Sequence, residues 1–195
     1  MRKLILPMVM VTTLVLGACG NETKTNNEKP NAQETSGSEL TFKVNGKEKS
    51  VEAKTMNMNN KNISVKTPEG FKVDANPDGD ILNGTGKYKG FQIVPEKLPS
   101  TGKVIAAKSS ALSATKINTK ELPKEVKLAD FPKLKDKYDA YYVGQSDEFR
   151  VHALRKNVGK DKMFGLTIKV PVSQTSEETD ALVRSIAETY KFEQK

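Results

Sequence analysis

The stretch Lys162-Met-Phe-Gly-Leu-Thr-Ile-Lys-Val170 places an apolar side chain at every second position, from Phe164 to Val170. Alternate residues of a β-strand point to the same face, so this stretch is predicted to be a strand with one buried face. Residues 138–143 and 148–156 are also rich in strand-forming residues, and short polar segments separate the three stretches. Three successive strands joined by short turns predict an antiparallel meander at the centre of the fold.

A hairpin is predicted nearer the N-terminus. Asn45-Gly46 lies between residues 40–44 and 49–53, and this dipeptide is a strong hairpin signal because both turn positions favour a positive φ. The remaining expected elements are two pairs of short strands, one helix, and a charged segment with one short strand. They cover residues 63–66 with 71–73, 80–83 with 89–94, 100–115, and 120–137.

The last predicted element is an amphipathic helix. Thr175 with Glu178 has the spacing of a capping box, and Leu182, Ile186 and Tyr190 recur every four residues as an apolar stripe. These patterns together predict an α+β fold. Its antiparallel sheet carries an N-terminal hairpin and a C-terminal amphipathic helix packed on it.

The first 20 residues have the organisation of a signal peptide. Arg2 and Lys3 precede a 13-residue apolar run over residues 4–16, which is too short to span a bilayer as a helix. Leu16-Gly-Ala-Cys19 resembles the lipobox of bacterial prolipoproteins. That resemblance implies a diacylglyceryl group on the Cys19 thiol, acyl chains such as palmitate, and cleavage just before Cys19. The alternative is an ordinary secretory signal with an incidental cysteine.

The lipobox interpretation divides the chain into three parts. Residues 1–18 form the lipoprotein signal peptide, residues 19–38 a lipid-anchored disordered tether, and residues 39–195 a single α+β domain. Ala32 is the only apolar side chain between residues 20 and 38, so that segment is too polar to fold alone. Two acyl chains hold a protein stably on a membrane, which predicts a location at the extracytoplasmic face of the cell membrane.

Composition narrows the classes of function. The chain carries a net charge of +8, but its lysines alternate with acids, which is typical of a solvated surface. Attraction of these lysines to anionic lipid headgroups or cell-wall polymers remains an alternative. No nucleic-acid-binding motif is present. Because Cys19 is the only cysteine, the rest of the chain offers no disulfide, thiolate metal site or cysteine nucleophile.

The order of motifs resembles the PsbP and DcrB-like group over most of residues 60–195. The Asn45-Gly46 hairpin precedes the entry Ile63-Ser-Val-Lys-Thr-Pro-Glu-Gly-Phe71, and the terminal helix ends in Glu188-Thr-Tyr-Lys-Phe192. The resemblance implies an α/β/α sandwich around an antiparallel sheet. It also implies a binding or assembly factor, commonly without enzymatic activity.

One segment has the oxygen-ligand spacing of a calcium loop. Asp74, Asn76, Asp78 and Asp80 occupy its first, third, fifth and seventh positions, with glycine at the sixth. Thr85 replaces the glutamate expected at the twelfth position, and the same residue types also form ordinary turns. No metal site or cofactor is assigned, and calcium binding from Asp74 to Asp80 stays an alternative.

His152 is the only histidine, and catalysis would require it to act as base for a serine such as Ser146. No nucleophile-elbow motif accompanies it, so a surface or inter-strand histidine is expected. Alternation predicts Tyr138 and Tyr142 on one face and Tyr141 on the other. A binding surface would use whichever of these rings, or Phe149, stays exposed, beside Arg150 or Arg155.

The sequence therefore predicts a non-catalytic binding or accessory lipoprotein of the cell envelope. Its partner would be an envelope protein or a small ligand that the sequence does not identify. A calcium- or small-solute-binding module is the alternative, and a cell-envelope hydrolase is a third possibility that lacks a recognisable catalytic motif.

Overall fold

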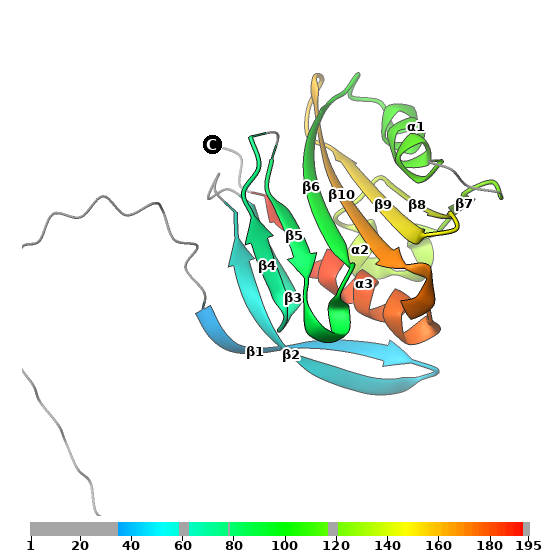
Figure 1. Cartoon of the computed structure of the whole chain (residues 1–195). Coiled ribbons are helices and arrows are strands. Elements are labelled where there is room, and N and C mark those ends of the chain that lie inside the picture. Colours follow the sequence, from blue (N-terminus) through cyan, green and yellow to red (C-terminus); the bar gives the residue numbers. More distant parts are fainter. Residues whose placement is uncertain (1–34, 59–62, 78, 117–120, 193–195) are drawn as a thin grey trace, which may run out of the picture.

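Two antiparallel sheets and three helices make up the described part of the chain (Figure 1). A computed structural model describes residues 35–58, 63–77, 79–116 and 121–192. The predicted signal peptide, Cys19 and the predicted tether up to residue 34 lie outside these ranges. The mixed α+β class with antiparallel sheets is confirmed. No helix in the described ranges is long and apolar enough to cross a bilayer.

The larger sheet has seven strands in the order β4-β5-β6-β10-β9-β8-β7. Their bounds are β4 Phe71–Asp74, β5 Ile81–Gly84, β6 Gln92–Pro99, β7 Lys124–Glu125, β8 Ala140–Gln145, β9 Phe149–Asn157 and β10 Lys162–Pro171. The predicted meander is confirmed as the neighbours β8, β9 and β10. Phe164, Leu166, Ile168 and Val170 are all buried, as their alternation predicts. Met163 and Thr167 on the opposite face are buried as well, so the prediction of a single buried face is wrong, because this part of the sheet is covered on both sides.

The smaller sheet has the order β1-β2-β3-β11. It comprises β1 Thr35–Val44, β2 Lys47–Asn57, β3 Ile63–Pro68 and β11 Lys191–Phe192. The turn between β1 and β2 has φ values of 51° at Asn45 and 75° at Gly46, which suit a two-residue hairpin loop. β1 begins at Thr35, within the segment expected to be tether.

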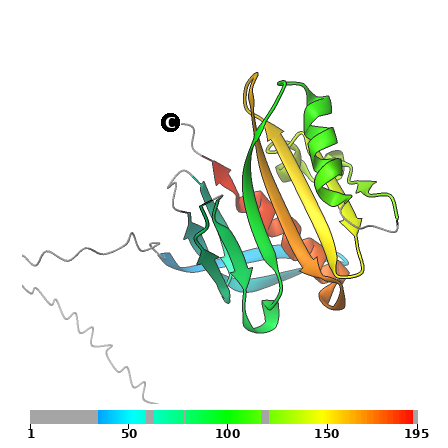
Figure 2. The same cartoon turned by 45° about the horizontal axis from the view of Figure 1, so that its top comes forward.

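Helices α1 and α3 lie on opposite sides of the larger sheet (Figures 1 and 2). α1 Val104–Thr115 covers β8 and β9 through Ala107 and Ala111. α3 Glu177–Thr189 lies between the two sheets. The Tyr138 hydroxyl, just before β8, donates to the carbonyl of Ala187 at 2.9 Å, and the Ser185 hydroxyl donates to Thr41 on β1 at 3.0 Å.

Three predicted details are wrong. The N-cap of α3 is Ser176, whose side chain accepts from the Thr179 amide, because the chain is still in a short 3₁₀ turn just before Thr175. The charged segment contains a short helix, α2 Pro132–Lys135, with proline at its start. β6 begins and ends later than predicted, because the turn at residues 86–90 delays its start.

Candidate functional site

A pocket of about 470 Å³ opens beside the β8–β9 hairpin and the first turns of α3. Its base is formed by Tyr141, Arg150, His152, Asp180 and Arg184. Alternation along β9 directs Arg150 and His152 to the α3 side of the sheet. Asp180 and Arg184 are four residues apart on α3, so the helix presents both to the same side.

A chain of polar contacts links four of these side chains. The Tyr141 hydroxyl lies 2.7 Å from Nδ1 of His152, and Nε2 of His152 lies 3.4 Å from Oδ1 of Asp180. Nη2 of Arg150 lies 2.8 Å from the other carboxylate oxygen of Asp180. The His152 side chain is only 1% exposed and bonds to Tyr141 of the neighbouring strand β8. Of the surface or inter-strand position that the sequence predicted, the inter-strand one is therefore observed.

Burial sets the charge states of the side chains that these polar contacts link. It lowers the pKa of His152, and the bond and charge of Asp180 oppose this without reversing it. It also raises the pKa of Tyr141, whose hydroxyl therefore keeps its proton and donates to Nδ1 of His152. Burial alone would raise the pKa of Asp180, but contact with His152 and the charges of Arg150 and Arg184 lower it overall. The base thus contains a neutral imidazole and an ionised carboxylate.

Three buried polar atoms at the base have no hydrogen-bond partner among the described residues. They are Nε of Arg150, Nε2 of His152 and Oδ1 of Asp180. A buried polar atom without a partner is destabilising by about 1–3 kcal/mol. Two further such atoms, Oγ1 of Thr67 and the Tyr190 hydroxyl, lie outside this pocket. Nε2 of His152 and Oδ1 of Asp180 face each other at 3.4 Å, so the donor left for a bound molecule is Nε of Arg150.

The charge of the base is also unbalanced. At the base, Arg150 and Arg184 contribute two positive charges against the single negative charge of Asp180. The rest of the lining adds one lysine and two acids, Lys124 with Glu121 and Asp147, so the excess is local to the base and the pocket as a whole is neutral. The Arg184 guanidinium lies 4.9 Å from the centre of the Phe131 ring, a cation–π contact that holds it without neutralising it. An anionic group is therefore the chemistry that this base accommodates best.

No protein family, curated protein or solved structure matches the chain.

The arrangement required of a serine hydrolase is not assembled. Ser146 lines the same pocket, but its hydroxyl donates to the carbonyl of Phe149 at 3.2 Å and accepts from the Phe149 amide at 3.0 Å. It therefore closes the β8–β9 turn. Both ring nitrogens of His152 face other side chains, Tyr141 and Asp180, so neither is directed to Ser146.

The predicted distribution of aromatic and arginine side chains is partly wrong. Tyr138 and Tyr141 both pack on the α3 side and are buried, because β8 begins only at Ala140 and alternation does not extend back to Tyr138. Tyr142 lies on the α1 side and donates to Glu125. Arg155 is 1% exposed and pairs with Glu96 at 2.9 Å, so only Arg150 reaches the pocket.

The segment with calcium-loop spacing forms the connection between β4 and β5. Asp78 lies outside the described residues. Oδ2 of Asp74 accepts from the Asn83 amide at 3.4 Å, and among the described residues no group of three or more histidine, cysteine or acidic side chains is placed to hold a metal ion.

Sequence reasoning missed Asp180 and Arg184. The four-residue spacing of the pair does indicate a shared helix face, but only the docking of α3 on the sheet shows that this face meets His152.

Proposed function

We propose that the protein is a membrane-anchored, extracytoplasmic lipoprotein that binds a small ligand with an anionic group and performs no catalysis. The observation that carries the ligand proposal is the base of the pocket. It combines the unpartnered Nε of Arg150 with a local excess of positive charge from Arg150 and Arg184. A volume of about 470 Å³ lies within the range typical of small-molecule sites.

The anchor proposal is supported by the lipobox pattern from Leu16 to Cys19. An α/β/α sandwich of the PsbP and DcrB-like type is proposed for the domain. Its support is the placement of α1 and α3 against opposite faces of one antiparallel sheet, together with the hairpin of β1 and β2. An envelope protein as the partner, in place of a small ligand, is the alternative within the same class of function.

Ligand binding is tested by thermal unfolding with millimolar acetate, succinate and inorganic phosphate. Binding to the folded state raises the melting temperature with ligand concentration. Arg184→Gln is expected to abolish the rise, because it removes the excess positive charge at the base of the pocket. Lys133→Gln, at an exposed lysine outside the pocket, is expected to retain it.

The ligand proposal is wrong if none of these anions raises the melting temperature. It is also wrong if Arg184→Gln responds as the unaltered protein does. A fluorophosphonate probe that labels Ser146 would instead favour the hydrolase.

The anchor is tested separately in the producing bacteria. Radiolabelled palmitate is expected to enter the unaltered protein, and mass analysis is expected to find the mature N-terminus at Cys19. Cys19→Ala is expected to release the protein from the membrane fraction. Cleavage at another bond, or no incorporation of palmitate, contradicts the anchor and leaves the ligand proposal standing.

A further inference from the structure

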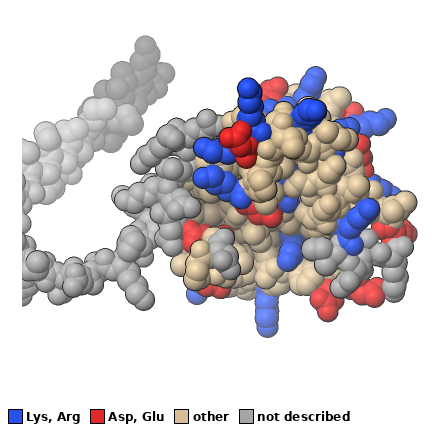
Figure 3. Space-filling model, turned by 90° about the horizontal axis from the view of Figure 1, so that it is seen from above, with Lys and Arg blue, Asp and Glu red and all other residues tan. Residues whose placement is uncertain are grey.

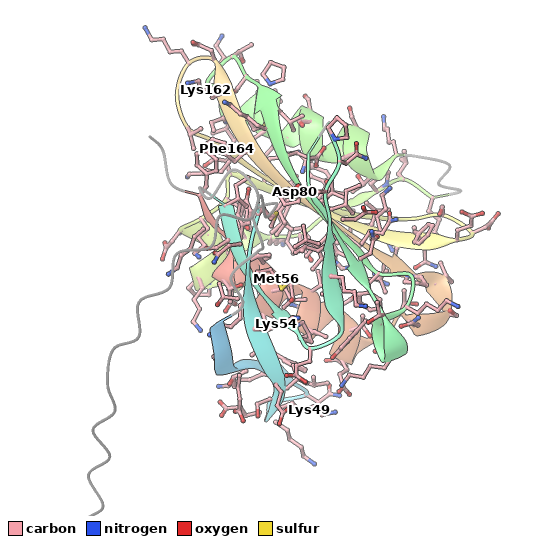
Figure 4. The ribbon with its side chains drawn as sticks, turned by 60° about the vertical axis from the view of Figure 1, so that its left-hand side comes forward. Lys49, Lys54, Met56, Asp80, Lys162 and Phe164 are labelled. Carbon is pink, nitrogen blue, oxygen red and sulfur yellow. The ribbon has the colours of Figure 1, made fainter. Side chains whose placement is uncertain are left out.

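Four lysines that are dispersed in the sequence converge at one end of the larger sheet. Lys97 and Lys103 flank the connection from β6 to α1, and Lys160 and Lys162 belong to the turn between β9 and β10. We call these four lysines, with Val104 and Ile105, the basic end. Figure 3 views the molecule from above and shows basic side chains (blue) standing out from this face beside acidic ones (red), and Figure 4 shows Lys162 far from Lys49 on β2.

Hydrogen bonds fix the two connections of the basic end together. The Ser100 hydroxyl donates to the Asn157 side chain at 2.5 Å, and the Asn157 amide donates to the carbonyl of Lys103 at 3.0 Å. The Ser100 amide donates to the carbonyl of Asp161 at 3.1 Å. The lysines are therefore carried on a fixed platform formed by both connections.

The charge of the basic end is not balanced within the described residues. All four lysines are exposed, and none forms an ion pair there. Asp161 is the one acid within the turn between β9 and β10. Glu96, next to Lys97, is already paired with Arg155. The basic end thus carries an excess of three positive charges.

Two exposed apolar side chains lie among the lysines of the basic end. Val104 is 53% exposed and Ile105 is 64% exposed, in the first turn of α1. The sheet-facing stripe of α1 is taken by Ala107 and Ala111 further along the helix. Val104 and Ile105 therefore extend beyond the part of α1 that packs on the sheet, at the same end as Lys103 and Lys160.

We propose that the basic end docks on the surface of an anionic bilayer. Lysines are attracted to anionic headgroups, and apolar side chains between them enter the headgroup boundary, which is how amphipathic surfaces bind membranes. The bilayer is favoured over a protein partner because the apolar area is confined to two side chains, whereas the charge excess is spread over two connections. This proposal rests on the proposed lipid anchor.

The proposed anchor is compatible with this orientation. The chain from Cys19 to Thr35 could extend to roughly 55 Å, so it permits either end of the domain to approach the bilayer. Tethering also raises the effective concentration of the basic end at the surface, so weak attraction suffices to orient the domain.

A fluorophore at position 105 tests the docking. The full protein, isolated from the producing cells, carries Ile105→Cys and a polarity-sensitive thiol dye, and it is placed in vesicles of phosphatidylcholine with or without phosphatidylglycerol. If Cys19 is acylated, the introduced thiol is the only free one. A blue shift is expected with phosphatidylglycerol and not with phosphatidylcholine alone. The same dye at Leu122→Cys, another exposed apolar position, is expected to show no shift.

The charge requirement is tested by Lys160→Gln with Lys162→Gln. The ratio of docked to undocked protein is expected to fall about 25-fold, since each lysine at an anionic surface contributes roughly fivefold. The matched control is Lys87→Gln with Lys89→Gln, at the opposite end of β6, which is expected to leave the shift unchanged.

The proposal is overturned by the absence of a shift at position 105, by an equal shift in neutral vesicles, or by a shift that appears only when an envelope protein is added. Mass analysis of Cys19 separates these results from failure of the anchor. If Cys19 carries no acyl chain, it is changed to serine and the same vesicles are titrated with the unanchored protein. A blue shift at position 105 with phosphatidylglycerol then supports docking, and its absence contradicts docking.

Discussion

The neutral state of His152 links stability to pH. A histidine in the unfolded chain has a pKa near 6.5, and burial lowers the pKa of His152 in the folded protein. As the pH falls, His152 is therefore protonated in the unfolded state before it is protonated in the folded state. Stability is unaffected above about pH 6.5 and falls below it, by up to roughly 1.4 kcal/mol per pH unit, until the folded pKa is reached.

His152→Gln is expected to remove this loss of stability. The measurement is the free energy of unfolding in denaturant at several pH values between neutrality and about pH 5. The lowered pKa of Asp180 acts in a separate, more acidic window, where protonation of its carboxylate removes stability. If the free energy of unfolding of the variant falls with pH as steeply as that of the unaltered protein, another group causes the loss of stability.

Asp180 compensates the partly buried charge of Arg150. It is 17% exposed and contacts both Arg150 and His152, so Asp180→Asn is expected to destabilise the protein by about 2–4 kcal/mol. Glu178→Gln is the control on the same helical turn. Its pair with Lys49 is about half exposed, so the loss should stay below about 1 kcal/mol. Equal losses in chemical denaturation would contradict this account.

At the scale of single elements, the start of α3 allows a direct comparison. Ser176→Ala removes the acceptor for the Thr179 amide and is expected to cost about 1 kcal/mol of stability. Thr175→Ala, at the position predicted to be the cap, should cost less, because the Thr175 hydroxyl bonds only the carbonyl of Val172. The unfolding midpoints of the two variants measure which substitution costs more stability. A larger loss in Thr175→Ala would show that Thr175 is the N-cap, as the sequence predicted.

Elements with a clear period were predictable from the sequence, and elements fixed by neighbours were not. The alternation of β10 and the four-residue repeat of α3 both correspond to observed elements. The strand β6 extends through Pro95 and Pro99, residues that disfavour strands. They are tolerated because β5 pairs only with Gln92 and Ile93, which leaves one edge of β6 open beyond them.

The candidate site was less predictable than the fold. His152 and Arg150 were noted from the sequence, but their role depends on Asp180, which reaches them only through the docking of α3. The basic end has the same origin, since Lys97 and Lys160 are distant in sequence and become neighbours through the pairing of β6 with β10. Periodicity specifies which face of an element is buried, but not which residues of another element it meets.

At the scale of the whole molecule, α3 joins the two sheets into one core. Val183 and Ile186 are fully buried in the same cluster as Leu40 of the smaller sheet and Leu166 of the larger sheet. Ile186→Ala is expected to destabilise the protein by about 3 kcal/mol, the usual range for a buried isoleucine. Both sheets should be destabilised by the same amount, because they unfold as one cooperative unit.

Amide hydrogen exchange measures this coupling. Slowly exchanging amides of β2 and β10 are expected to speed up by the same factor in Ile186→Ala, and calorimetry is expected to show a single transition. Two transitions, or acceleration confined to one sheet, would show that the sheets are separate cooperative units.

The late position of α3 and β11 in the chain governs when the protein acquires its structure. Residues 177–192 occupy the space between sheets built from residues 35–171 and complete the smaller one through the pairing of β11 with β3. A partly synthesised chain without these residues lacks the piece that closes its interior. Its core therefore stays open until residues 177–192 are available, and the folded shape forms in one late step.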